Sequence, residues 1–369
     1  MYGAPEILSS ENSAPLARSI PQPRASTMPE RILLIQLRRI GDVLMTTPAL
    51  RALRHAYSRA RIVYLTEPPS DQLFAHDPRV DEVWVTPRHQ PWRDRLALFA
   101  RLRRARFDLV IDFFSNPASA LMARASGAPR RIGFDFRLRR WAFTDRVPVS
   151  AARRYAPLDK GELLVPLGID LGSPLPELFL AEPERARARA LLATLGVAPD
   201  DFLVALMPVS RQPYKVWPLE RFARLADALI ARHRAKVLFV WGPGEEDVIR
   251  RVRAGMARAA LPDYPVPDLL GLAALLEQCR LYVGNDAGPR HFAIAVGTPT
   301  VGIFGRPFPE NWTPPGDRRH RTVAFDPGCK AACTFPRCDH LSCIRGVTYD
   351  AVQHTTDELI GSLSDGRLV

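Results

Sequence analysis

The sequence predicts an α/β protein made of two doubly wound parallel-sheet domains. Short, continuously apolar runs recur along the chain, as is typical of strands buried on both faces of a parallel sheet. Helical stretches separate these runs, which gives the strand–helix alternation of such a sheet. The alternation begins again after a segment rich in Pro and Gly at 157–183, which we interpret as the link between domains. A chain of 369 residues is long enough for two domains.

The composition favours a globular cytoplasmic protein. Hydrophobic residues make up 47% of the chain and charged residues 24%, and no apolar run approaches the roughly 20 residues of a membrane-spanning helix. Residues 1–29 lack the apolar core of a signal peptide, and we expect a disordered tail, with Met28 as an alternative start. Five cysteines, four of them late in the chain, do not resemble a secreted disulfide scaffold.

The first predicted strand, 31–37, leads into a turn that carries a carboxylate. Gly41 permits a tight turn, and Asp42 falls at the start of the following helix. Asp42 is either an N-cap, which would contribute about 1 kcal/mol, or a functional carboxylate at the carboxyl edge of the strand. Open α/β sheets bind their ligands at that edge.

Three further strands are predicted in the first half, at 61–65, 82–85 and 109–113. Two segments of this half, 93–107 and 130–143, are basic with interleaved apolar and aromatic residues. Each is either a solvated face or a surface that contacts an anionic bilayer or the phosphates of an acceptor.

The second half opens with a strand at 202–207 and a polar turn before a helix at 219–233. The turn holds Ser210, Arg211 and Lys215, of which the lysine is unusual because the chain has only four lysines among its 51 basic residues. A lysine is a compact point charge suited to phosphate. The alternative is a solvated loop lysine.

A strand at 237–241 is followed by a Gly-rich turn with Glu245 and Glu246. A carboxylate in this position can accept hydrogen bonds from both hydroxyls of a ribose. Alternatively, it only favours the dipole of the helix that follows. Of the two glutamates, we favour Glu245 as the ribose ligand.

The stretch 281–305 reads as strand, polar turn, helix and strand. The turn presents Gly288 and the free amides of a helix N-terminus, an arrangement that binds anions and phosphates above all. Asp286 lies at the mouth of this site and His291 one turn into the helix. The other interpretation is an ordinary strand–helix corner in which Asp286 is an N-cap.

This stretch closely resembles the signature of the bacterial ADP-heptose:lipopolysaccharide heptosyltransferases, which form glycosyltransferase family nine. Gly41–Leu44 (Gly-Asp-Val-Leu) and Lys215–Pro218 (Lys-x-Trp-Pro) match two further motifs of that family, and the resemblance covers roughly residues 30–360. The usual Asp-Thr-Gly-x-x-His pattern has Ala287 in place of Thr, which removes one hydroxyl but leaves the backbone amides. The resemblance implies the GT-B fold, in which two doubly wound domains face a central cleft.

The resemblance also implies a reaction, a set of site residues and a domain layout. The reaction is inverting, metal-independent transfer of a heptose from ADP-heptose, the donor substrate, to the lipopolysaccharide inner core, without a cofactor. Asp42 and Lys215 are the implied catalytic residues. The implied donor-binding residues are Ser210, Glu245, Glu246, Asp286, Ala287, Gly288 and His291, and the implied acceptor-binding residues are Arg39, Arg137 and Arg140. The expected domains are an acceptor-side domain at 30–170, a donor-binding domain at 180–345 and a terminal helix at 346–369 that packs back on the first domain.

The net charge of +12 has two interpretations, compositional bias towards arginine or a polyanionic partner. No nucleic-acid-binding motif is present, so we expect a nucleotide-sugar donor, a lipid-linked saccharide acceptor and peripheral contact with the inner face of an anionic inner membrane. The alternatives are a related transferase with another nucleotide sugar or a protein acceptor, and a non-catalytic polyanion-binding protein. Four cysteines lie close together late in the chain: Cys329, Cys333, Cys338 and Cys343. A similar cluster occurs in many members of the family that the chain resembles. The four residues either bind a metal ion or are reduced thiols or a local disulfide.

Overall fold

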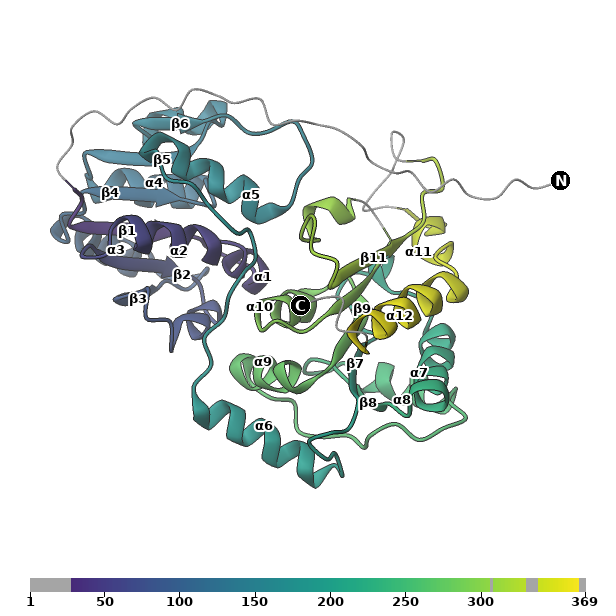
Figure 1. The fold of residues 1–369 in the computed structure, drawn as a ribbon. Coiled ribbons are helices and arrows are strands. Elements are labelled where there is room, and N and C mark those ends of the chain that lie inside the picture. The colour runs from purple at the N-terminus through teal and green to yellow at the C-terminus, as the bar shows by residue number, and fades with distance from the viewer. Residues whose placement is uncertain (1–27, 306–307, 330–337, 365–369) are drawn as a thin grey trace.

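The computed structural model describes residues 28–305, 308–329 and 338–364, and it confirms the predicted α/β class. Two parallel sheets, each flanked by helices, lie side by side (Figure 1). The strand order is β3-β2-β1-β4-β5-β6 in the first sheet and β11-β10-β9-β7-β8 in the second. The expected disordered tail lies outside the described residues, apart from positions 28 and 29.

The strands of the first sheet are β1 Arg31–Ile35, β2 Arg61–Thr66, β3 Glu82–Val85, β4 Leu109–Asp112, β5 Arg130–Phe134 and β6 Asp145–Val147. Those of the second sheet are β7 Leu203–Met207, β8 Lys236–Phe239, β9 Leu281–Asn285, β10 Thr300–Phe304 and β11 His320–Ala324. The sequence did not predict β5, β6 and β11. All three carry charged residues, and β6 and β11 are edge strands, where polar residues are common.

The α-helices of the first half are α1 Ile40–Leu44, α2 Thr47–Ala56, α3 Trp92–Arg104, α4 Pro117–Ser126 and α5 Ala156–Gly161. The later ones are α6 Glu182–Thr194, α7 Leu219–His233, α8 Glu246–Ala254, α9 Leu269–Gln278, α10 Gly288–Ala295, α11 Ser342–Arg345 and α12 Tyr349–Ser364. Short 3₁₀ turns are η1 Ser70–Phe74, η2 Arg137–Ala142, η3 Glu162–Leu167, η4 Pro213–Lys215 and η5 Pro309–Asn311. The bounds of α7 match the prediction.

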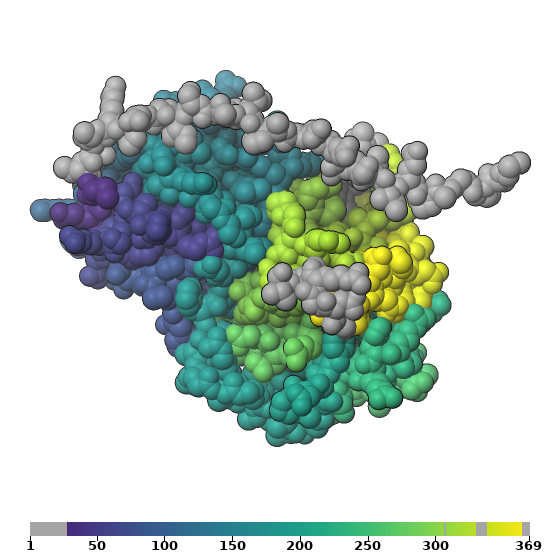
Figure 2. Space-filling view, in the orientation of Figure 1, coloured from purple at the N-terminus to yellow at the C-terminus, as the bar shows by residue number. Residues whose placement is uncertain are grey.

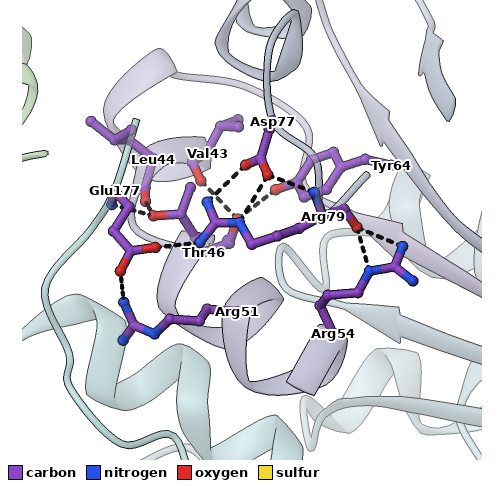
Figure 3. Close-up of polar contacts among 10 residues, drawn as sticks. Val43, Leu44, Thr46, Arg51, Arg54, Tyr64, Asp77, Arg79 and Glu177 are labelled. Atoms are coloured by element: carbon purple, nitrogen blue, oxygen red, sulfur yellow. Dashed lines mark hydrogen bonds and ion pairs between the residues drawn. The ribbon is translucent and has the colours of Figure 1, made fainter. Parts of the chain in front are cut away.

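The linker between η3 and α6 is fixed to the first domain at Glu177 (Figure 3). Its carboxylate accepts hydrogen bonds from Arg51 and from the buried Arg79, whose Nη1 lies 2.5 Å away. Its backbone N–H donates to Thr47 Oγ1 at 2.9 Å. Arg79 is itself held by a two-point contact with Asp77. The linker up to this residue therefore belongs mechanically to the first domain.

On the other side of the linker, Arg185 fixes α6 to the second domain. Its guanidinium makes a bidentate contact with Glu277 of α9, at 2.8 and 3.0 Å, and a third hydrogen bond to the carbonyl oxygen of Leu180. The chain thus passes from one domain to the other over the few residues between Glu177 and Leu180.

The expectation that the terminal helix packs back on the first domain is wrong. The described part, α12, packs on β10, β11 and α7 of the second domain. Asp357 on this helix contacts Arg232 and His233 at the end of α7, and Glu358 pairs with Arg321 of β11. The second domain therefore includes its own terminal helix.

Candidate functional site

The two domains meet where α1 and α10 pack against each other (Figure 1). The space-filling view shows the purple-to-teal first half of the chain lying against the green second half (Figure 2). Gly41 makes this approach possible, because a β-carbon at that position would lie 3.1 Å from Cδ2 of His291. Such a separation is tighter than ordinary van der Waals contact. The start of α1, with Gly41 and Asp42, therefore lies against the first helical turn of α10 in the second domain.

Asp42 is half-buried within α1 and is not an N-cap, because Arg39 occupies the cap position. Burial raises the pKa of the Asp42 carboxyl group, and the positive charges of Lys160, Arg39 and Lys215 oppose that rise. Lys215 belongs to the second domain, so the carboxylate and this ammonium group act on each other across the contact between domains. A half-buried carboxylate of this kind is suited to accepting a proton.

Lys215 ends η4 and forms an ion pair with Asp286, with 2.5 Å between Nζ and Oδ2. The loop that carries Lys215 is anchored on both sides of the lysine by Asn285, the residue before Asp286. Asn285 donates to the carbonyl oxygen of Pro208 at 2.9 Å and accepts from the backbone N–H of Trp217 at 3.1 Å. Trp217 is fully buried. The lysine is therefore presented by an anchored loop, and the interpretation as a solvated loop lysine is wrong.

The N-terminus of α10 is open at Gly288, around which no atom lies within 4 Å of an added β-carbon. Ala287 occupies the cap position without a side-chain hydrogen bond, so Asp286 is not the N-cap either. The first amides of a helix have no partner within it. His291 is buried, and burial lowers its pKa to about 4, so the imidazole is neutral at pH 7.

A pocket of about 750 Å³ lies on the second domain, lined by residues on both sides of Lys215 but not by those at the start of α10. It lies between the loop after β7, the start of α8 and α11, and it is lined by Ser210 and Glu245 but not by Glu246. Glu245 precedes α8 and accepts a hydrogen bond from the backbone N–H of Gly242 at 2.8 Å. The pocket is large enough for a nucleoside.

Because Glu245 lines the pocket and Glu246 does not, we predict that Glu245 contributes to nucleotide binding and that Glu246 does not. Glu245→Ala should weaken ADP binding about tenfold, because a hydrogen bond to a charged group contributes about 1.5–3 kcal/mol. Glu246→Ala is the matched control and should change the affinity less than twofold. Calorimetric titration of both variants with ADP checks this. Equal losses in the two would remove the special role of Glu245.

The predicted acceptor residues lie at the carboxyl edge of the first sheet. Arg39 is exposed beside Asp42, in a strained turn where Arg38 and Arg39 have φ values of 61° and 48°. Arg137 and Arg140 lie on η2, just beyond β5, which is separated from β1 only by β4. Arg140 contacts Asp135 through two hydrogen bonds, at 2.6 and 2.9 Å. Among the described residues no hydrogen bond or ion pair engages the side chain of the exposed Arg137.

The late cysteines give no support to a metal site in the part of the chain that is described. Cys329, Cys338 and Cys343 are free thiols there, and no group of three or more His, Cys, Asp or Glu side chains could hold a metal ion. Cys333 lies outside the described residues.

Two residues near Asp42 were not predicted. Lys160 of α5 has its ammonium group at the ends of β1 and β4, where it donates to the carbonyl oxygen of Phe113 and to Gln36 Oε1. Asp112 at the end of β4 is fully buried, and burial raises its pKa to about 6. The rarity of lysine in this chain was the available signal for Lys160, as it was for Lys215.

Comparison with known proteins gives the same architecture. Residues 95–336 match the family model for glycosyltransferase family 9 (heptosyltransferase). Lipopolysaccharide heptosyltransferase 3 of Escherichia coli is 27% identical over 294 residues, which cover 74% of this chain and 83% of that protein. A glycosyl transferase family 9 structure from Veillonella parvula has a TM-score of 0.77 at 25% identity, over 89% of this chain and 97% of that one. E. coli heptosyltransferase WaaC with ADP-2-deoxy-2-fluoro heptose has a TM-score of 0.66 at 20% identity, over 89% and 99%.

Proposed function

The chain belongs to glycosyltransferase family 9 (heptosyltransferase), and from that premise we propose that it transfers a heptose from ADP-heptose to the inner core of lipopolysaccharide. Relatives with the name lipopolysaccharide heptosyltransferase support the class of sugar and product. The observation that carries the proposal is that α1, which holds Asp42, packs on α10 of the second domain, and that Lys215, the partner of Asp286, acts electrostatically on the Asp42 carboxylate. The two domains thus supply a proton acceptor, Asp42, and a side chain that can bind phosphate, Lys215, on opposite sides of their contact.

The proposed step is a single displacement that inverts the anomeric carbon. The acceptor hydroxyl gives its proton to the Asp42 carboxylate as its oxygen forms a bond to that carbon. The bond from the same carbon to the diphosphate oxygen breaks, and ADP leaves with the electron pair. The raised pKa of Asp42 makes its carboxylate a stronger proton acceptor than an exposed aspartate.

Stabilisation of the departing diphosphate is assigned to the second domain. Lys215, the hydroxyl group of Ser210 and the amides at Ala287–Gly288 would share its negative charge. These groups can neutralise a leaving diphosphate without a divalent ion, and the sequence has no D-x-D metal-holding motif. Asp286 would contact the donor sugar.

The nucleotide specificity of the pocket tests this function directly. A thermal-shift series with ADP, UDP and GDP at equal concentrations should show the largest stabilisation with ADP, because bound ligand raises the free energy of unfolding in proportion to the logarithm of its affinity. A larger shift with UDP or GDP would indicate a transferase with another donor. No shift with any of the three would favour a non-catalytic polyanion-binding protein.

The acceptor is lipid-linked, so we also place a peripheral membrane contact on η2 of the first domain. No helix in the described part of the chain is long and apolar enough to span a bilayer. On η2, however, Leu138 is 84% exposed and Trp141 is 55% exposed, next to the exposed Arg137. Apolar side chains among arginines are typical of an interfacial surface. The basic α3 is a weaker candidate, because Arg101 pairs with Glu82 of β3.

Arg137→Gln should lower partition into vesicles with anionic lipid about fivefold at physiological salt, since a basic residue near such a surface contributes about 1 kcal/mol. Co-sedimentation at low and high salt measures the partition. Arg250→Gln, a change at an exposed arginine on α8 of the second domain, is the control. If both variants sediment like the wild type, η2 is a solvated face.

A further inference from the structure

Lys160 lies at the switch point of the first sheet. The chain runs from β1 to β2 and β3 on one side, then returns to β4 on the other, so the point between the ends of β1 and β4 is where an open α/β sheet places its ligands. The Lys160 ammonium group donates to one residue after each of these strands, Phe113 through its carbonyl oxygen and Gln36 through Oε1 at 3.1 Å. The half-buried lysine is thus held at the functional edge of the sheet.

Both hydrogen-bond partners are neutral, so neither cancels the charge of Lys160. No ion pair of this lysine occurs within the described ranges. Burial lowers the pKa of Lys160, and three nearby carboxylates oppose that change: Asp42, Asp112 and Asp159. The attraction is mutual, because Lys160 opposes the rise in the pKa of Asp42 more strongly than any other charged group does.

The other cations that face Asp42 are less able to act during the reaction. Arg39 is exposed, so water and salt screen its charge. Lys215 is paired with Asp286 and, in the proposed reaction, also faces the diphosphate. The neighbouring His291 is neutral, because burial lowers its pKa to about 4. Of the three cations that act on Asp42, Lys160 is half-buried and, within the described ranges, forms no ion pair.

We propose that Lys160 is a positioning residue that holds the Asp42 carboxylate ionised so that it can accept the proton of the acceptor hydroxyl. The inference rests on the proposed role of Asp42 as general base. Burial alone raises the pKa of the Asp42 carboxyl group and so increases its protonated, inactive fraction at a given pH. The fixed ammonium group at the switch point reverses part of that effect without touching the substrate.

The experiment compares the pH dependence of kcat/KM for wild type, Lys160→Gln and Lys160→Arg. A carboxylate base is active when deprotonated, so the rate falls as the pH drops through its pKa. Loss of the cation raises that pKa, and in Lys160→Gln the acid limb should move up by about one pH unit, the lower end of the usual effect of an opposite charge. At high pH the rate should approach that of wild type. Lys160→Arg keeps the positive charge and should leave the acid limb of the profile at the same pH as in wild type.

Lys236→Gln, at the start of β8 in the second domain, is the control and should leave the profile unchanged. If Lys160→Gln does not fold, Lys160→Met removes the charge without leaving a polar group. A lower rate at every pH with an unmoved acid limb would overturn the inference and leave Lys160 a structural residue. Absence of transfer by the wild type at every pH would instead refute the proposed function itself.

Discussion

Asp42→Asn is expected to lower turnover about 100-fold or more while ADP affinity stays close to that of wild type, because loss of a general base commonly costs this much. Asn fills the same half-buried space but cannot accept the proton. The residue belongs to the first domain, whereas the pocket and the Lys215–Asp286 pair belong to the second, so donor binding should survive. Steady-state kinetics and an ADP titration on the same preparation separate the two effects.

The matched control for this change is Asp200→Asn, at an exposed residue before β7. It should leave turnover and ADP affinity as they are. Near-normal turnover in Asp42→Asn would remove this residue from the mechanism. An equal loss of ADP affinity would mean that the carboxylate holds the donor, either directly or through Lys215.

Lys215→Ala should weaken ADP binding about 10- to 100-fold and slow transfer, because a charge-assisted hydrogen bond to phosphate contributes about 1.5–3 kcal/mol. Lys215→Arg should restore only part of the affinity, since the planar guanidinium differs in geometry from a point charge. Calorimetric titration with ADP measures both, and Lys236→Ala is the control. Unchanged affinity in Lys215→Ala would exclude the phosphate role.

The loss in Lys215→Ala has a second physical source that must be separated from the first. Removing Lys215 leaves Asp286, only 5% exposed, without its partner, and an uncompensated buried carboxylate repels a diphosphate. The double variant Lys215→Ala/Asp286→Asn removes both charges. If the ammonium group itself binds phosphate, affinity should stay low. Full recovery would show that the effect came from Asp286 alone.

The fold could be predicted because its central strands are apolar throughout. Runs such as 31–35 and 203–207 are buried over nearly their whole length, and burial on both faces leaves a continuous signal in the sequence. The edge strands carry no such signal. In β6, Asp145 and Arg146 are half-buried or exposed, so the pattern resembles a loop.

Tertiary contacts set the parts of the site that could not be predicted. Asp42 and Asp286 each stand at the start of a helix, and the sequence alone could not distinguish a cap from a functional carboxylate. The distinction depends on Lys215, which is 71 residues from Asp286 and pairs with it only in the folded chain. Lys160 is likewise distant in sequence from Gln36, its hydrogen-bond partner.

The proposed activity of this chain is the transfer of a heptose from ADP-heptose to a lipopolysaccharide core. Its most direct test is to mix the purified protein with ADP-heptose and a core acceptor that lacks heptose, and then to follow ADP release and the mass of the acceptor. We expect ADP release that requires the acceptor, together with a gain of one heptose residue on it, and both signals should fall about 100-fold in Asp42→Asn. ADP release without a change in acceptor mass, or transfer from another nucleotide sugar in preference to ADP-heptose, would contradict it.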